Sequence, residues 1–244
     1  MPPTATAIPT TEPSATPRPT IDLQLVLTPI ITVEYEVDYF GLKTSDDVML
    51  IAKQFGTGDL AVVLAHQGAF EANQRDWEPF ARVIAERGYF AVTLDFRGHG
   101  ASRGDVTTSY NIIKDMRALI DYLHAEGYDR IVCIGASMGG TACLQAAVEY
   151  DLVGVAAIGS LMSNGEPTRI TEDELAALTI PKLFITTEND GNNVPKTIKR
   201  MYEVSQEPKL LRIFPGNVHG TEMFKQPYAE QFTAELLAFL EALR

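Results

Sequence analysis

Short apolar segments alternate with helix-like segments along most of the chain, and this alternation constrains the fold more than any other feature. The segments predicted to be strands are residues 31–39, 48–55, 61–66, 89–96, 130–136, 152–160, 182–188 and 209–214. The first two alternate apolar and polar residues, which is typical of a half-exposed antiparallel pair. Most of the others are nearly continuous apolar runs, which suit parallel strands that are buried on both faces.

Helical patterns separate several of the predicted strands. The clearest apolar stripe comprises Ile112, Ile113, Met116, Leu119, Ile120 and Leu123. A second stripe begins at Trp77, a short helix fits residues 171–178, and a closing helix fits residues 232–243. Such alternation predicts an α/β fold with a mostly parallel central sheet of about eight strands and helices on both faces. In sheets of this kind the ligand site lies beyond the carboxyl ends of the strands.

Residues 1–20 differ in composition from the rest of the chain. They are almost entirely Pro, Thr, Ala and Ser, with too few large apolar groups to offset the entropy of ordering. We therefore expect a disordered tail over 1–20 and a single folded domain over 21–244. Pro/Thr-rich segments are typical of spacers on surface proteins, so the sequence favours an exported or cell-surface tethered protein. A cytoplasmic protein with an uninformative flexible N-terminus is the alternative.

The charge balance excludes several partners. The chain has 32 acidic and 20 basic residues, which gives a net charge of −12. Phosphate backbones and anionic membrane surfaces repel such a chain, so we expect no nucleic-acid partner, and a polyanionic substrate is the least expected kind. No stretch approaches the roughly 18 apolar residues of a membrane helix, so we expect no membrane span.

The two cysteines point to core packing rather than to chemistry. Cys133 lies in an apolar run and Cys143 in the helix-like segment that follows. Each is interpreted as a small buried hydrophobe, and neither has the spacing of a metal ligand. We expect neither a metal nor an organic cofactor.

A serine lies in a glycine-rich turn directly after the predicted strand at 130–136. The segment reads Gly135-Ala136-Ser137-Met138-Gly139, and a helical pattern follows it. Between a buried strand and a helix, this G-x-S-x-G pattern is typical of a sharp turn that exposes a nucleophilic serine. The helix behind it directs its N-terminal N–H groups at the same point and favours developing negative charge there. A glycine-rich turn with an incidental serine is the alternative.

These residues resemble the α/β-hydrolase fold family, whose members carry nucleophile, acid and base in that chain order, each just after a strand. The resemblance covers nearly all of residues 31–244. Asp190 follows the predicted strand at 182–188, and His219 follows the one at 209–214. Only about 20 residues separate the sixth predicted strand from the strand before Asp190, so the large cap domain of many members is not expected.

The resemblance implies a catalytic triad. Ser137 would be the nucleophile, His219 the general base, and Asp190 the group that orients the imidazole and stabilises the imidazolium. Asp190 as a turn-forming residue and Glu188 as the true acid are the alternatives at the acid position. A loop histidine without a catalytic role is the alternative for His219.

The predicted oxyanion hole departs from the family pattern. Members commonly have His-Gly after the third strand, whereas this chain has His66-Gln67-Gly68. Matched by position, the donors are the backbone N–H groups of Gly68 and Met138, with Gln67 or Ala69 as alternatives to Gly68. Two such donors are expected to lower the barrier by several kcal/mol.

The other histidines have plainer roles. His99 lies in a DFRGHG turn that is similar to a structural turn of the family, after its fourth strand. His124 lies late in a predicted helix, where we expect it to be solvated.

An open site with an apolar lining fits an ester substrate. Candidate lining residues, each of which also fits an ordinary core role, are Phe70, Met138, Leu161, Met162, Met223 and Phe224. A serine at the nucleophile position argues against dienelactone-type and haloalkane-type chemistry. The resemblance therefore implies a carboxylesterase-like serine hydrolase that cleaves small or exposed esters through an acyl-enzyme intermediate. The alternatives of the same fold are a thioesterase, an amidase, a C–C bond hydrolase and a perhydrolase. A non-catalytic binding module is a further alternative.

Overall fold

The computed structural model describes residues 38–69, 71–105, 111–162 and 169–244. These residues form one mixed sheet of eight strands in the order β1-β2-β4-β3-β5-β6-β7-β8. The strands are β1 (Asp38–Lys43), β2 (Met49–Phe55), β3 (Ala61–Ala65), β4 (Phe90–Leu94), β5 (Ile131–Ala136), β6 (Gly154–Ile158), β7 (Lys182–Thr187) and β8 (Lys209–Phe214). Strand β2 runs antiparallel to β1 and β4. The other six strands, β3 to β8, are parallel to one another. The prediction of a mostly parallel sheet of about eight strands is confirmed.

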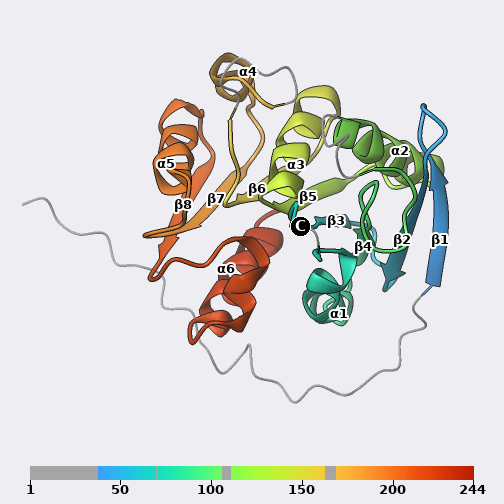
Figure 1. Cartoon of the computed structure of the whole chain (residues 1–244), viewed down its shortest axis with the longest axis horizontal. Helices are drawn as coiled ribbons and strands as arrows, with labels where there is room; N and C mark the ends of the chain where they lie inside the picture. The colour runs from blue at the N-terminus through green and yellow to red at the C-terminus, as the bar shows by residue number, and fades with distance from the viewer. Residues whose placement is uncertain (1–37, 70, 106–110, 163–168) are drawn as a thin grey trace, which may run out of the picture. The chain divides into compact units, whose positions relative to one another are not determined.

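Helices cover both faces of the sheet (Figure 1). They are α1 (Glu78–Ala85), α2 (Ile112–Ala125), α3 (Met138–Glu149), α4 (Glu172–Ala177), α5 (Val194–Val204) and α6 (Ala229–Glu241), with 3-10 helices η2 (Gln74–Trp77) and η4 (Gly220–Lys225). Buried residues of α2, α3, α4 and α5 share one core, and those of α1 and α6 share the other.

The central strands explain why their sequences read as continuous apolar runs. All five residues of β3 are buried. Ala61, Val63 and Ala65 belong to the core under α2 and α3, whereas Val62 and Leu64 belong to the core under α1 and α6. Successive side chains of a strand point to opposite faces, so a strand covered on both faces needs apolar residues at every position.

The first predicted strand extends further towards its carboxyl end than expected. It was expected over 31–39, of which 31–37 lie outside the described residues, and among the described residues it runs from Asp38 to Lys43 and pairs with β2 through a hairpin. Thr44 closes the turn, because its Oγ1 accepts a hydrogen bond from the Val48 N–H at 3.0 Å. The inward residue Leu42 is buried, so the pattern of burial continues past the end of the predicted segment.

The predicted Pro/Thr-rich tail over residues 1–20 lies outside the described residues, and export or surface tethering stays a prediction. Between β6 and β7, the described residues contain the short helix α4, as predicted for residues 171–178. A capping box starts this helix: Thr171 accepts from the Glu174 N–H, and the Glu174 carboxylate accepts from the Thr171 N–H. Across the described residues, no helix is long and apolar enough to cross a membrane.

Candidate active site

Ser137 lies in a strained turn between β5 and α3. Its backbone has φ 49° and ψ −112°, a conformation that L-residues rarely adopt and that costs about 1–3 kcal/mol. Two backbone hydrogen bonds hold it there. The Ser137 N–H donates to Ile158 O at 2.7 Å, and the Thr141 N–H donates to Ser137 O at 2.9 Å. The Ser137 side chain is half-buried, so the turn presents the hydroxyl at the carboxyl end of the sheet.

The glycines beside Ser137 are required by close packing. A Cβ on Gly135 would overlap the backbone of Gly139, and a Cβ on Gly139 would overlap the carbonyl groups of Ala65 and His66. The first turn of α3 therefore lies directly against β5 and the end of β3. This contact is the physical reason for the G-x-S-x-G pattern at this turn.

His219 and Asp190 form a hydrogen-bonded pair, as expected from the sequence. The His219 Nδ1 lies 2.8 Å from Asp190 Oδ2 and 2.9 Å from Asp190 Oδ1. The Asp190 side chain is only 4% exposed, whereas that of His219 is 37% exposed. Asp190 follows β7 and His219 follows β8, and Glu188, the alternative acid, is exposed. The pair thus has a buried acceptor that orients an accessible imidazole.

Contacts between backbone segments bring the serine turn and the histidine loop together. A Cβ on Gly220, the residue after His219, would lie 3.3 Å from the Cβ of Ala136, the residue before Ser137. A Cβ on Gly159 would lie 3.1 Å from His219 Nδ1, and Gly159 follows the residue that accepts from the Ser137 N–H. No described residue hydrogen-bonds the Ser137 hydroxyl. Catalytic hydrogen bonds commonly tighten only when a substrate binds.

The two predicted oxyanion donors are neighbours. A Cβ on Gly68 would lie 3.2 Å from Met138 Sδ and 3.3 Å from Met138 Cβ. Among the described residues, none accepts a hydrogen bond from the N–H of Gly68 or of Met138. Both donors are therefore available to a ligand. Met138 is the first residue of α3, and the N-terminal end of a helix favours negative charge.

The predicted lining residues have different surroundings. Leu161 is half-buried, and its carbonyl accepts from Thr141 Oγ1 at 3.3 Å, next to the serine turn. Met162 is buried in the core under α2 and α3. Met223 is 1% exposed in the other core, and Phe224 packs its ring against Trp77 at 5.5 Å. Met162, Met223 and Phe224 therefore serve the two cores, and Phe70 lies outside the described residues.

The described residues also place two of the other histidines and the two cysteines. His99 is buried, and its Nδ1 lies 3.0 Å from Ala72 O, whereas His124 is exposed near the end of α2. Cys133 and Cys143 are fully buried free thiols, and burial raises the pKa of Cys143. Across the described residues, no group of three or more His, Cys, Asp or Glu side chains is placed to hold a metal ion.

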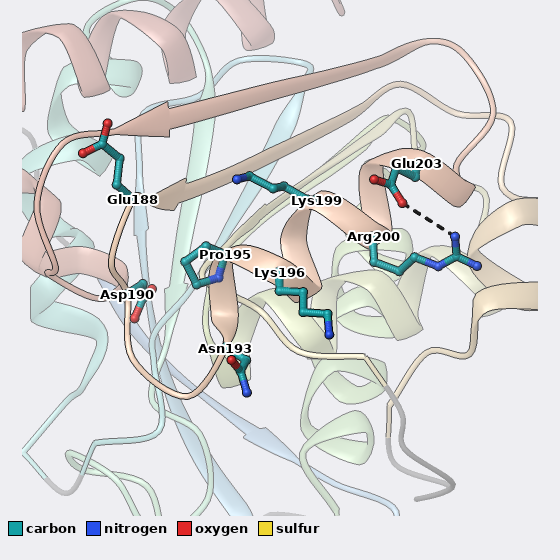
Figure 2. Close-up of a pocket in the computed structure, with 8 residues that line it drawn as sticks. All are labelled: Glu188, Asp190, Asn193, Pro195, Lys196, Lys199, Arg200 and Glu203. Atoms are coloured by element: carbon teal, nitrogen blue, oxygen red, sulfur yellow. Dashed lines mark ion pairs between the residues drawn. The ribbon is translucent and has the colours of Figure 1, made fainter.

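A polar groove of about 620 Å³ opens beside Asp190 (Figure 2). Its lining residues are Glu188, Asp190, Asn193, Pro195, Lys196, Lys199, Arg200 and Glu203. It carries three acidic and three basic side chains, and Arg200 pairs with Glu203 at 3.6 Å and with Glu172 at 2.6 Å. Neither Ser137 nor His219 lines it, so this groove flanks the pair and does not surround the nucleophile.

Comparisons with known proteins agree with this architecture. The model of the Hydrolase_4 family, described as serine aminopeptidase S33, matches residues 58–166, a range that includes Ser137 but not Asp190 or His219. A carboxylesterase of Bacillus subtilis is 31% identical over 103 residues, and the match spans 41% of this chain and 41% of that enzyme.

Solved structures extend the likeness over most of the chain. The Pyrococcus furiosus esterase Pf2001 superposes with a TM-score of 0.70 at 19% identity, covering 85% of this chain and 93% of that one. The esterase RhEst1 of Rhodococcus superposes with a TM-score of 0.69 at 16% identity, covering 84% of this chain and 99% of that one. The chain therefore has the α/β-hydrolase fold, and it resembles proteins named as esterases in both sequence and structure.

Proposed function

We propose that this chain is a serine hydrolase that cleaves small or exposed carboxylic esters. The observation that carries the proposal is the strained Ser137 turn at the start of α3, close to a hydrogen-bonded His219–Asp190 pair. A backbone held in a rarely populated conformation is typical of functional sites, because it costs free energy that packing alone does not require.

The proposed reaction has two steps. In the first, Ser137 Oγ attacks the ester carbonyl carbon, and its proton passes to His219 Nε2. The carbonyl oxygen becomes an oxyanion held by the N–H groups of Gly68 and Met138. The C–O bond to the alcohol then breaks, and the alcohol leaves with the proton from His219. In the second step water adds to the acyl-serine by the same route and releases the carboxylic acid.

Asp190 supports both steps by fixing the imidazole. Its buried carboxylate accepts the hydrogen bond from Nδ1, which leaves Nε2 as the nitrogen that accepts the serine proton. The same carboxylate stabilises the imidazolium that forms once His219 has taken that proton.

An ester is favoured over other acyl substrates by the similarity to proteins named as esterases and a carboxylesterase. The match to a family described as serine aminopeptidase makes an amide substrate the second candidate. Both reactions pass through the same acyl-serine.

Covalent labelling tests the proposal. A fluorophosphonate probe is expected to label the protein at Ser137 and to leave Ser137→Ala unlabelled. Ser45→Ala is the matched control, because Ser45 is an exposed loop serine and its removal should not affect labelling. A folded protein that resists the probe would refute a serine hydrolase.

A substrate panel then defines the acyl group. We expect turnover of p-nitrophenyl esters with short acyl chains, and loss of turnover in His219→Ala without unfolding. Faster turnover of thioesters or of aminoacyl p-nitroanilides would replace the carboxylic ester with the corresponding substrate class.

A further inference from the structure

The side chain of Gln67 connects two segments that are far apart in the sequence. Gln67 Oε1 accepts a hydrogen bond from the Thr221 N–H at 3.1 Å, across 154 residues of chain. Thr221 lies in the first turn of η4, two residues after His219, and the His219 side chain does not cap this helix. The first N–H groups of a helix need acceptors from outside it, and Gln67 supplies one of them.

The backbone of Gln67 is fixed from the opposite side. The Phe96 N–H donates to His66 Nε2 at 3.0 Å, so Nε2 is an acceptor and the imidazole proton lies on Nδ1. That Nδ1–H donates to Gln67 O at 2.7 Å. His66 is fully buried, and burial lowers its pKa to about 4, so the ring is neutral at neutral pH and keeps this tautomer.

The histidine loop is shaped to receive the Gln67 amide. A Cβ on Gly220 would overlap Gln67 Oε1, and Gly220 has a φ of +57°. Only glycine leaves room for the amide oxygen at this point. Gln67, which stands where members of the family commonly have glycine, therefore has a partner of complementary shape in the loop that carries His219.

We propose that Gln67 is a positioning residue that clamps the oxyanion segment, residues 66–68, to the loop that carries His219. The clamp acts on both catalytic elements at once, because Gly68 follows Gln67 directly and His219 lies two residues before its hydrogen-bond partner. It keeps the Gly68 N–H and the His219 ring at fixed positions relative to the Ser137 turn. This inference rests on the proposed function.

Gln67→Met tests the clamp, because methionine keeps the length of the side chain and removes the acceptor. Loss of one hydrogen bond corresponds to about a tenfold change in an equilibrium or rate. We expect kcat on a p-nitrophenyl ester to fall about tenfold with KM within twofold of its original value. We also expect the Thr221 amide to exchange its hydrogen with solvent at least tenfold faster. Gln54→Met on β2 is the matched control, and it should change neither quantity.

A second variant reaches the same contact from the other side. Gly220→Ala displaces the Gln67 amide, so kcat should fall in this variant too. Adding Gln67→Ala to it should lower kcat little further, because both changes break the same contact between Gln67 and Thr221. Unchanged kcat in Gln67→Met, or an unchanged Thr221 exchange rate, would overturn the clamp. If the unmodified protein hydrolyses no ester and resists the fluorophosphonate, the proposed function fails, and the Thr221 exchange rate alone decides whether the clamp exists.

Discussion

Replacing Gly159 by alanine tests the geometry of the proposed catalytic pair directly, because Gly159 lies against both of its members. Gly159 follows β6 and has a φ of +61°. A Cβ at this position would lie 3.1 Å from His219 Nδ1 and 3.2 Å from Asp190 Oδ2. Both separations are tighter than normal contact, so the imidazole and the carboxylate must move by a few tenths of an ångström.

The structure gives the size of both expected effects. A residue other than glycine in this backbone region costs about 1–2 kcal/mol, which lowers Tm by about 2–8 °C for a domain of this size. Misplacing a catalytic group by about 1 Å can cost about a hundredfold in rate. A shift of a few tenths of an ångström therefore predicts a fall in kcat of about 4- to 10-fold.

Gly127→Ala separates strain from displacement. Gly127 also has a positive φ, +90°, but a Cβ there would meet nothing within 4 Å. It should lower Tm by a similar amount and leave kcat on a p-nitrophenyl ester unchanged. The reasoning is refuted if Gly159→Ala keeps full kcat, or if Gly127→Ala loses as much activity as Gly159→Ala.

Two further predictions concern buried groups. Asp190→Asn places an N–H group where the carboxylate accepts a hydrogen bond, so His219 takes the wrong tautomer and kcat should fall about 10⁴-fold. The circular dichroism spectrum should stay like that of the parent protein. Activity within tenfold of the parent would mean that another acid serves His219. The second concerns stability in acid. The pKa of His66 is lowered from 6.5 to about 4 by burial, so the unfolded state binds more protons between these values. The associated stability is fully present above pH 6.5 and is lost as the pH falls towards 4, by about 3 kcal/mol. Urea unfolding across this range should show a shallower pH dependence in His66→Gln, and identical slopes would contradict the assignment.

The parts of the site that follow from local chain geometry could be predicted from the sequence. The turn at Ser137 needs glycine where backbones touch, and the apolar runs around it need strands buried on both faces. The resemblance to the α/β-hydrolase fold family implied Asp190 and His219, because each follows a predicted strand in the family's chain order, and the structure brings these two side chains together. The strand and turn predictions depended on residues within about ten positions, whereas the acid and the base were implied by the chain order of the family.

The parts that depend on distant partners could not be predicted. The sequence showed Gln67 only as a departure from the family pattern, because its hydrogen-bond partner lies 154 residues away. The surroundings of Met223 and Phe224 are set by the helices that pack around them, and the apolar character of a side chain does not distinguish a core contact from a pocket wall. The carboxyl end of β1 was placed four residues too early, because the pairing of this strand with β2 continues through Gly41 to Lys43.

The backbone conformation of Ser137 makes Ser137→Ala a specific test of the hydroxyl group. Its unfavourable φ is fixed by backbone hydrogen bonds to Ile158 O and from the Thr141 N–H, neither of which involves the serine hydroxyl. Serine and alanine both carry a Cβ, so Ser137→Ala retains the steric cost and the bonds that offset it. The turn should therefore keep its shape when the hydroxyl is removed. A loss of labelling in this variant would then report on the chemistry of the oxygen atom and not on the fold around it.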